Sequence, residues 1–114
     1  MEKKRQKQVS ELIRRSFSSV LLERGMYIYG QALVSVTDVV MSPDLRVAKI
    51  YLSIFNAQDK NAVFEMLLHH VTSLKNDLVK HIRNHVRIIP EIRLFRDDLL
   101  DEMDKVSKLL DSID

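Results

Sequence analysis

The sequence predicts an α+β domain of two layers, with a three-stranded sheet and helices packed on one face of it. Apolar residues recur at helical spacing over 4–24, 59–70, 73–86 and 99–113. Residues 33–41 and 46–55 are rich in Val, Ile and Leu, and another short strand follows Pro90. The expected order is α-β-β-α-α-β plus a C-terminal helix. A chain of 114 residues has room for one domain, residues 1–114.

The first predicted helix covers residues 4–24. Val9, Ile13 and Phe17 belong to its apolar face, and Lys3, Lys7 and Arg14 fall opposite. Glycine commonly supplies the left-handed residue after a helix end, so Gly25 is expected to end this helix. Residues 25–32 then form a connection to the first strand.

The two strands that follow are expected to form a hairpin, because Ser42-Pro43-Asp44 is a turn signal. The second strand alternates in character. One face carries Ala48, Ile50, Leu52 and Ile54, and the other carries Lys49, Tyr51 and Ser53. This alternation predicts an antiparallel sheet covered on one side only.

The second half of the chain adds two helices, a strand and a last helix. In the helix over 73–86, an apolar stripe of Leu74, Leu78, Ile82 and Val86 lies opposite Lys80, Arg83, Asn84 and Arg87. Pro90 begins a strand over 91–96 that suits a sheet edge. Residues 97–114 are expected to form an acidic amphipathic helix with the stripe Leu99, Met103, Val106, Leu110 and Ile113.

The charges are segregated along the chain, although the net charge is only +2. Residues 1–15 and 75–96 each hold six Lys and Arg against two acids, while residues 97–114 hold seven acids against two Lys. Basic blocks of this kind favour a polyanion partner. The RNA-binding candidates are Lys3, Lys4, Arg5, Lys7, Arg14, Arg15, Lys75, Lys80, Arg83, Arg87, Arg93 and Arg96. Those from Lys80 to Arg96 are expected to form one continuous patch across a helix and the next strand.

Several other classes of function find little support. The chain has no cysteine, and its longest apolar runs are too short to span a membrane or to form a signal peptide. A cytoplasmic protein is therefore expected. No glycine follows Gly30, so no glycine-rich phosphate loop exists there, and neither an enzyme nor a cofactor is expected. His81 and His85, with Asp77, have helical spacing for metal ligands but no further ligand motif, so no metal site is predicted.

The predicted element order is that of the type II KH fold, and three runs of sequence make the resemblance specific. "SVTDVVMSPDLRVAKIYLSIF" from Ser35 resembles the hairpin of the ribosome-binding factor A family. "RIIPEIRLFRDD" from Arg87 resembles that family's Pro-Glu-hydrophobic strand, and "RQKQVSELIRRSFSSVL" resembles its first helix. The family replaces the Gly-x-x-Gly clamp of KH domains with an Ala-x-Gly kink between two helices. The matching positions here are Thr72, Ser73 and Leu74.

The resemblance implies a monomeric factor that binds the free small (30S) ribosomal subunit and its rRNA during late maturation, with roles in rRNA processing and growth in the cold. Two alternatives remain open at this point. One is a general RNA chaperone that uses the same basic surface. The other is an interaction module in which the stripe of the C-terminal helix seats a partner helix or a second copy.

Overall fold

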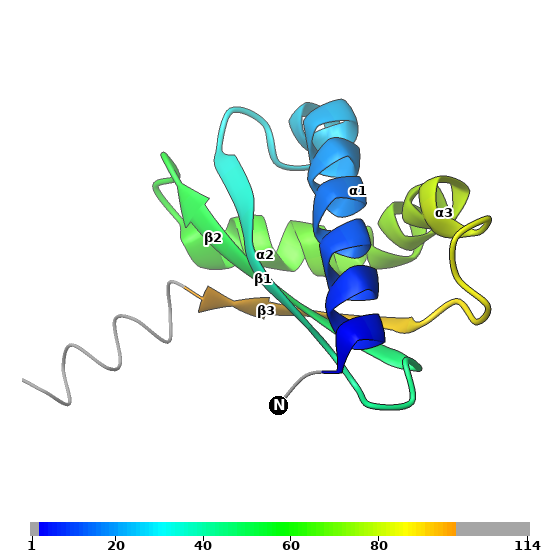
Figure 1. Ribbon diagram of the computed structural model, residues 1–114. Coiled ribbons are helices and arrows are strands. Elements are labelled where there is room, and N and C mark those ends of the chain that lie inside the picture. The colour runs from blue at the N-terminus through cyan, green and yellow to red at the C-terminus, as the bar shows by residue number, and fades with distance from the viewer. Residues whose placement is uncertain (1–2, 98–114) are drawn as a thin grey trace, which may run out of the picture.

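The computed structural model describes residues 3–97, and these follow the predicted order α-β-β-α-α-β (Figure 1). The elements are α1 (Lys4–Tyr29), β1 (Leu33–Met41), β2 (Val47–Phe55), α2 (Lys60–His69), α3 (Val71–Ile82) and β3 (Glu91–Arg96). The helices cover one face of the sheet, since α1 packs on β1 and α2 on β2. The α+β fold is therefore confirmed. Apart from Asp97, the predicted C-terminal helix lies outside the described residues.

Helix α1 is longer than the sequence predicts, and Gly25 does not end it. The helix continues through a buried Gly25 to Tyr29, with Ile28 also buried. A glycine inside a helix costs about 1 kcal/mol relative to alanine, but here the Tyr29 side chain occupies the place that a Cβ of Gly25 would need. Gly30, at φ 73° and ψ −136°, is the residue that ends the helix.

The sheet has the order β1-β2-β3 and is mixed. β1 and β2 pair antiparallel as predicted, from Leu33 opposite Phe55 to Met41 opposite Ala48, with a shift in register between Val36 and Asp38. β3 pairs with β2 in parallel, so the prediction of a wholly antiparallel sheet was wrong. The helices α2 and α3 form the crossover that a parallel pair requires. This crossover brings β3 back to the end at which β2 begins.

The core lies between the sheet and the helices. The predicted inner face of β2 is confirmed, because Ala48, Ile50, Leu52 and Ile54 are all fully buried. The helices contribute a matching set, which includes Ile13, Phe17, Val20, Leu67, Leu74, Leu78 and Ile82. The opposite face of the sheet is left without a covering helix in the described part of the chain.

The break between α2 and α3 lies at His70, not at Thr72, Ser73 and Leu74 as predicted. The N–H of His70 donates to the carbonyls of Met66 and Leu67, both at 3.2 Å. Its Nδ1 also lies 2.9 Å from the Met66 carbonyl oxygen. These contacts close the last turn of α2. Thr72, Ser73 and Leu74 instead belong to the first turn of α3, where Leu74 is buried in the core.

Helix α3 ends at Ile82, four residues before the predicted end at residue 86. The chain turns there, with the His85 N–H donating to the Ile82 carbonyl at 2.8 Å. It must turn because β3 begins beside the hairpin, where the Glu91 N–H donates to the Arg46 carbonyl at 2.7 Å. Val86 keeps a partly buried position against the core from this loop rather than from a helix.

Candidate nucleic-acid interface

The two basic segments meet at one edge of the domain, where the start of α1 lies beside the loop between α3 and β3. The Arg5 guanidinium donates a hydrogen bond from Nη2 to the His85 carbonyl at 3.2 Å. Arg5 and Arg87 also line the same hollow of about 290 Å³. Arg83, the exposed residue that caps α3, is two positions from His85 in the chain. We call Arg5, Arg83 and Arg87 the basic edge.

The hollow itself is largely apolar. Its walls come from α1, from the hairpin turn and from the α3–β3 loop, through Arg5, Val9, Asp44, Leu45, Val86, Arg87 and Ile88. All three charged side chains on this wall are exposed. An apolar floor with arginines at its rim can hold the ribose or base of a nucleotide while the guanidinium groups contact phosphates.

Gln6 fixes the start of α1 against the hairpin. Its side-chain amide donates from Nε2 to the Met41 carbonyl at 3.2 Å, and its Oε1 accepts from the Lys3 N–H at 2.9 Å. Gln6 is buried, whereas Lys4 and Arg5 are exposed. Gln6 therefore points into the domain and fixes the start of α1, whereas the neighbouring cations Lys4 and Arg5 remain at the surface.

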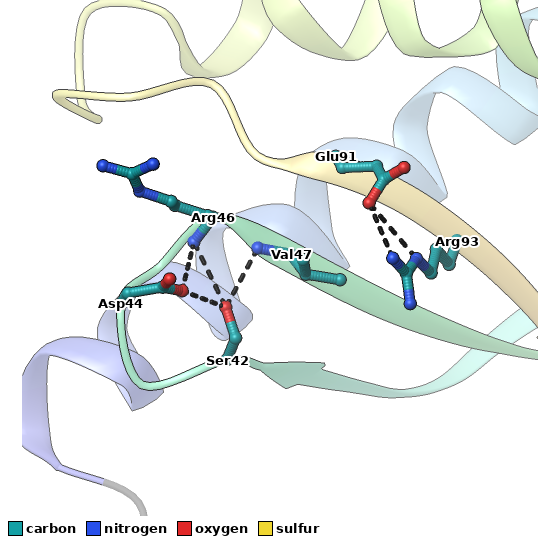
Figure 2. Close-up of polar contacts among 6 residues, drawn as sticks. All are labelled: Ser42, Asp44, Arg46, Val47, Glu91 and Arg93. Atoms are coloured by element: carbon teal, nitrogen blue, oxygen red, sulfur yellow. Dashed lines mark hydrogen bonds and ion pairs between the residues drawn. The ribbon is translucent and has the colours of Figure 1, made fainter.

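The hairpin turn contributes Asp44 and Leu45 to the wall of the hollow, and side-chain hydrogen bonds hold the turn together (Figure 2). Ser42 Oγ donates to Asp44 Oδ1 at 2.7 Å and accepts from the N–H groups of Arg46 and Val47 at 3.2 and 3.0 Å. Asp44 Oδ1 also accepts from the Arg46 N–H at 3.1 Å. These hydrogen bonds, that from Ser42 first, lower the pKa of the Asp44 carboxyl below its ordinary value. The left-handed φ of 63° at Leu45 completes the turn.

Replacing Ser42 by alanine is expected to destabilise the domain by about 1–2 kcal/mol, because the Val47 N–H loses its acceptor and the Asp44 carboxylate loses the Ser42 donor. Urea-induced unfolding with an unchanged m-value would measure this loss. Folding lowers the pKa of Asp44. The stabilisation contributed by its ionised carboxylate is therefore fully present above the pKa of Asp44 in the unfolded chain, and it is lost as the pH falls through the pKa of Asp44 in the folded protein. A Ser42→Ala protein as stable as wild type would show that the turn does not depend on this network.

Other predicted RNA-binding residues are engaged in ion pairs. Arg14 contacts Glu11 at 2.8 Å, and this pair lowers the pKa of Glu11 and raises that of Arg14. Lys80 lies 3.9 Å from Asp77, whose carboxylate is also 2.9 Å from Arg24 Nε. The Arg14–Glu11 pair is exposed and contributes little to stability, whereas the Asp77 side chain is only 13% exposed. Both acidic partners reduce the positive potential that these cations offer to a polyanion.

The continuous patch predicted from Lys80 through Arg96 is not formed. Residues three apart on a strand point to opposite faces. Arg93 accordingly lies on the open face of the sheet, where it pairs with Glu91 at 2.9 Å. Arg96 instead donates to the Asn61 side chain of α2 on the covered side.

The remaining predicted cations lie along the helices. Lys3, Lys4 and Lys7 are exposed at the start of α1, and Arg15 is exposed about three turns further along it. Lys75 is partly buried on α3. Arg83 and Arg87 do not lie on a helical face as predicted, because α3 ends before them. The first segment therefore extends the charge of the basic edge along α1, while the second segment divides between the loop, α3 and the two faces of β3.

Among residues 3–97, no three His, Cys, Asp or Glu side chains are grouped so that they could hold a metal ion. His85 lies beyond the end of α3, so the helical spacing of His81 and His85 is not realised. No helix in the described part of the chain has both the length and the apolar character needed to cross a bilayer.

The wall of the hollow, which includes Asp44, Leu45, Val86 and Ile88, was not predicted from the sequence. Asp44 and Leu45 come from the hairpin turn, and they meet the α3–β3 loop only because β3 pairs in parallel with β2. One local signal was available. Ile88 and Ile89 are exposed apolar residues directly beside Arg87, a combination unusual for a merely solvated loop.

A family model, related sequences and a solved structure all match this chain to ribosome-binding factor A. A family model described as Ribosome-binding factor A matches residues 5–110. A ribosome-binding factor A from Cytophaga hutchinsonii is 40% identical over 113 residues, which cover 99% of this chain and 85% of that protein. One from Gloeobacter violaceus is 38% identical, with coverage of 99% and 88%. The crystal structure of ribosome-binding factor A from Thermus thermophilus has the same fold, with a TM-score of 0.65 at 16% identity, and the match covers 80% of this chain and 94% of that one.

Proposed function

The chain belongs to the ribosome-binding factor A family, and on that premise we propose that it binds the free small ribosomal subunit through rRNA contacts at the basic edge. It is a maturation factor of the 30S subunit and not an enzyme. The observation that carries the proposed contact surface is the hydrogen bond from Arg5 to the His85 carbonyl. This contact joins two basic segments that lie far apart in the sequence.

The chemistry of the basic edge suits rRNA more than a protein surface. Arginine can contact a phosphate through two parallel hydrogen bonds. Such contacts position a protein on RNA without reading its bases, so recognition rests on the shape of the rRNA at the binding site. With about five phosphate contacts, the logarithm of the affinity should fall against the logarithm of the salt concentration with a slope near ~4. Lys3, Lys4, Lys7 and Arg15 can supply contacts beyond those of the basic edge.

We further propose that the protein acts as a cytoplasmic monomer during late maturation. It holds a junction of the rRNA in an immature arrangement, or prevents early joining of the large subunit, until it leaves. This role predicts a requirement in the cold, where incorrect RNA pairings are more persistent. Deletion of the gene should then leave precursor small-subunit rRNA and free subunits in excess at low temperature. Unchanged precursor levels and subunit profiles would contradict this role.

Direct binding is tested by sedimentation of the protein with purified free small subunits in the presence of bulk RNA. The protein is expected to remain with the subunits, and crosslinks should map to a restricted set of rRNA nucleotides. Equal distribution between subunits and bulk RNA would favour a general RNA chaperone instead. The interaction module that uses the C-terminal stripe concerns residues outside the described range. A dimer in light scattering that truncation at Asp98 abolishes would favour that alternative.

A further inference from the structure

The sheet face that the helices leave open carries two rows of side chains of distinct chemistry. In the parallel register of β2 and β3, Lys49 lies beside Arg93, and two residues further along Tyr51 lies beside Phe95. The two aromatic rings are stacked, with centroids 5.4 Å apart and an interplanar angle of 26°. We propose that this open face binds single-stranded RNA, with a base stacked on Tyr51 and Phe95 and a phosphate held by Lys49 and Arg93.

The cationic row points to an anionic ligand. Like charges directly opposite each other on neighbouring strands are destabilising. Arg93 turns toward Glu91, which relieves part of the repulsion (Figure 2). Lys49 is exposed and makes no ion pair within residues 3–97. A phosphate placed over this row would contact both cations and remove the remaining repulsion between them.

A hollow of about 370 Å³ adjoins the cationic row. It is lined by Val40, Met41, Ser42, Pro43, Val47, Lys49 and Arg93. Val40 is the register neighbour of Lys49 on β1, so the hollow continues the row across the sheet. Apart from Ser42, whose hydroxyl donates to Asp44, the other lining residues are apolar, so a phosphate would interact chiefly with the two cations.

The aromatic row provides the second part of the site. Phe95 is 38% exposed, and no helix of the described chain covers its face of the sheet. Aromatic side chains on adjacent strands form a platform on which RNA bases stack, and each stacked base is worth about 1–3 kcal/mol. Two residues along a strand span about 6.6 Å. The base and a phosphate of the same nucleotide, or of adjacent ones, can therefore reach both rows.

Acidic residues limit where the RNA backbone can run. Asp38 is the β1 neighbour of Tyr51, and Glu91 already occupies part of the Arg93 guanidinium. Only one or two phosphates can be neutralised on this face, so stacking must supply much of the affinity. A duplex, whose bases are already stacked, cannot use the platform. The site is therefore specific for single strands, unlike the basic edge.

The two surfaces are neighbours across the hairpin turn. Asp44 and Leu45 line the hollow at the basic edge, while Ser42, Pro43 and Val47 line the hollow on the open face. A single-stranded segment that leaves the rRNA at the basic edge could pass around the turn to the aromatic pair. RNA binding at the open face is nevertheless inferred from the contacts of that face alone, and it does not require binding to the ribosome.

The test measures binding of a labelled, unstructured RNA of about eight nucleotides by fluorescence anisotropy, a length within the site sizes of single-strand-binding folds. The double variant Tyr51→Leu and Phe95→Leu keeps apolar bulk but removes both rings. It is expected to bind about tenfold more weakly, with an unchanged dependence on salt. The double variant Lys49→Gln and Arg93→Gln should bind more weakly and reduce the salt slope by about 0.7, because one phosphate contact to a single strand is lost. The Leu pair should not alter the affinity for a duplex.

Phe55→Leu is the matched control, because Phe55 is 48% exposed at the far end of the same face and has Leu33 rather than a cation as its neighbour. It should bind the RNA as wild type does. Ultraviolet crosslinking of the wild-type protein gives a readout that does not depend on any variant, and it should identify Tyr51 or Phe95. Crosslinks confined to the α3–β3 loop, or an equal loss in Phe55→Leu, would overturn the proposal.

Two further outcomes distinguish a failure of the open-face site from a failure of the proposed function. If the Leu pair and the Gln pair bind the short RNA as wild type does, while charge reversal at the basic edge abolishes subunit binding, the open face is not an RNA site and the basic edge stands. If wild-type molecules form dimers that Tyr51→Leu disrupts, and no RNA crosslink forms, the face belongs to a second copy of the chain. That result would also overturn the proposal.

Discussion

A Phe17→Ala protein is expected to be less stable than wild type by about 3–5 kcal/mol in urea-induced unfolding. Phe17 is fully buried, and its helix packs on both β1 and α3. Removal of the ring leaves a cavity in the core, and the helix and sheet around it can close that cavity only in part. Small domains are stable by only about 5–15 kcal/mol, so this loss removes a large part of the total.

The matched control lies on the same helix. Leu22 is 86% exposed, and Leu22→Ala should change the free energy of unfolding by less than about 0.5 kcal/mol. Both variants should keep the m-value of wild type, which shows that the same surface is exposed on unfolding. A loss below about 1 kcal/mol for Phe17→Ala would contradict the packing of α1 against the sheet.

The parts of the fold that depend on local pattern were predictable. Alternation along β2 identified Ala48, Ile50, Leu52 and Ile54 as the inner face, because the period of a strand is visible within a few residues. The ends of the helices were not visible in this way. Gly25 remains within α1 because Tyr29 fills the adjacent space, and the break after α2 falls at His70. Both outcomes depend on contacts that form only in the folded domain.

The same distinction applies to the candidate site. The two charged blocks were evident in the sequence, but their meeting point depends on the crossover that returns β3 in parallel to β2. Arg83 and Arg87 were assigned to a helical face. They lie beyond the end of α3 instead, and Arg87 shares a hollow with Arg5. The placement of Arg93 and Arg96 on opposite faces of the sheet was predictable, since both belong to the predicted strand over 91–96 and lie three residues apart. The open face was partly predictable as well, because Lys49 and Tyr51 had been placed on the outer side of β2.

Reversing the charge of two residues of the basic edge, with Arg5→Glu and Arg87→Glu, is expected to weaken binding to free small subunits by about 60-fold or more in 0.1 M salt. Each phosphate contact releases close to one counterion, and at this salt concentration one such release is worth a factor of about 8 in affinity. The loss of two contacts therefore weakens binding by about 8 × 8, or about 60-fold, and repulsion between glutamate and phosphate weakens it further. Neither side chain is buried, so the fold should persist.

The salt dependence distinguishes lost contacts from a general loss of charge. The slope of log affinity against log salt should fall by about 2 in the double variant, since each lost phosphate contact removes about 1. Measurements of sedimentation or anisotropy at several salt concentrations give this slope directly. A weaker affinity with an unchanged slope would mean that the two arginines do not contact phosphates.

The control for the basic edge is the double variant Arg14→Glu and Lys80→Glu, which changes the net charge of the protein by the same amount. Arg14 is paired with Glu11 and Lys80 lies near Asp77, and neither lines the hollow that Arg5 and Arg87 share. This control should lose less than about tenfold in affinity, because charges beyond a Debye length are largely screened. An equal loss in both double variants would assign the binding to net charge alone, and a larger loss in the control would move the rRNA contact from the basic edge to the outer faces of α1 and α3.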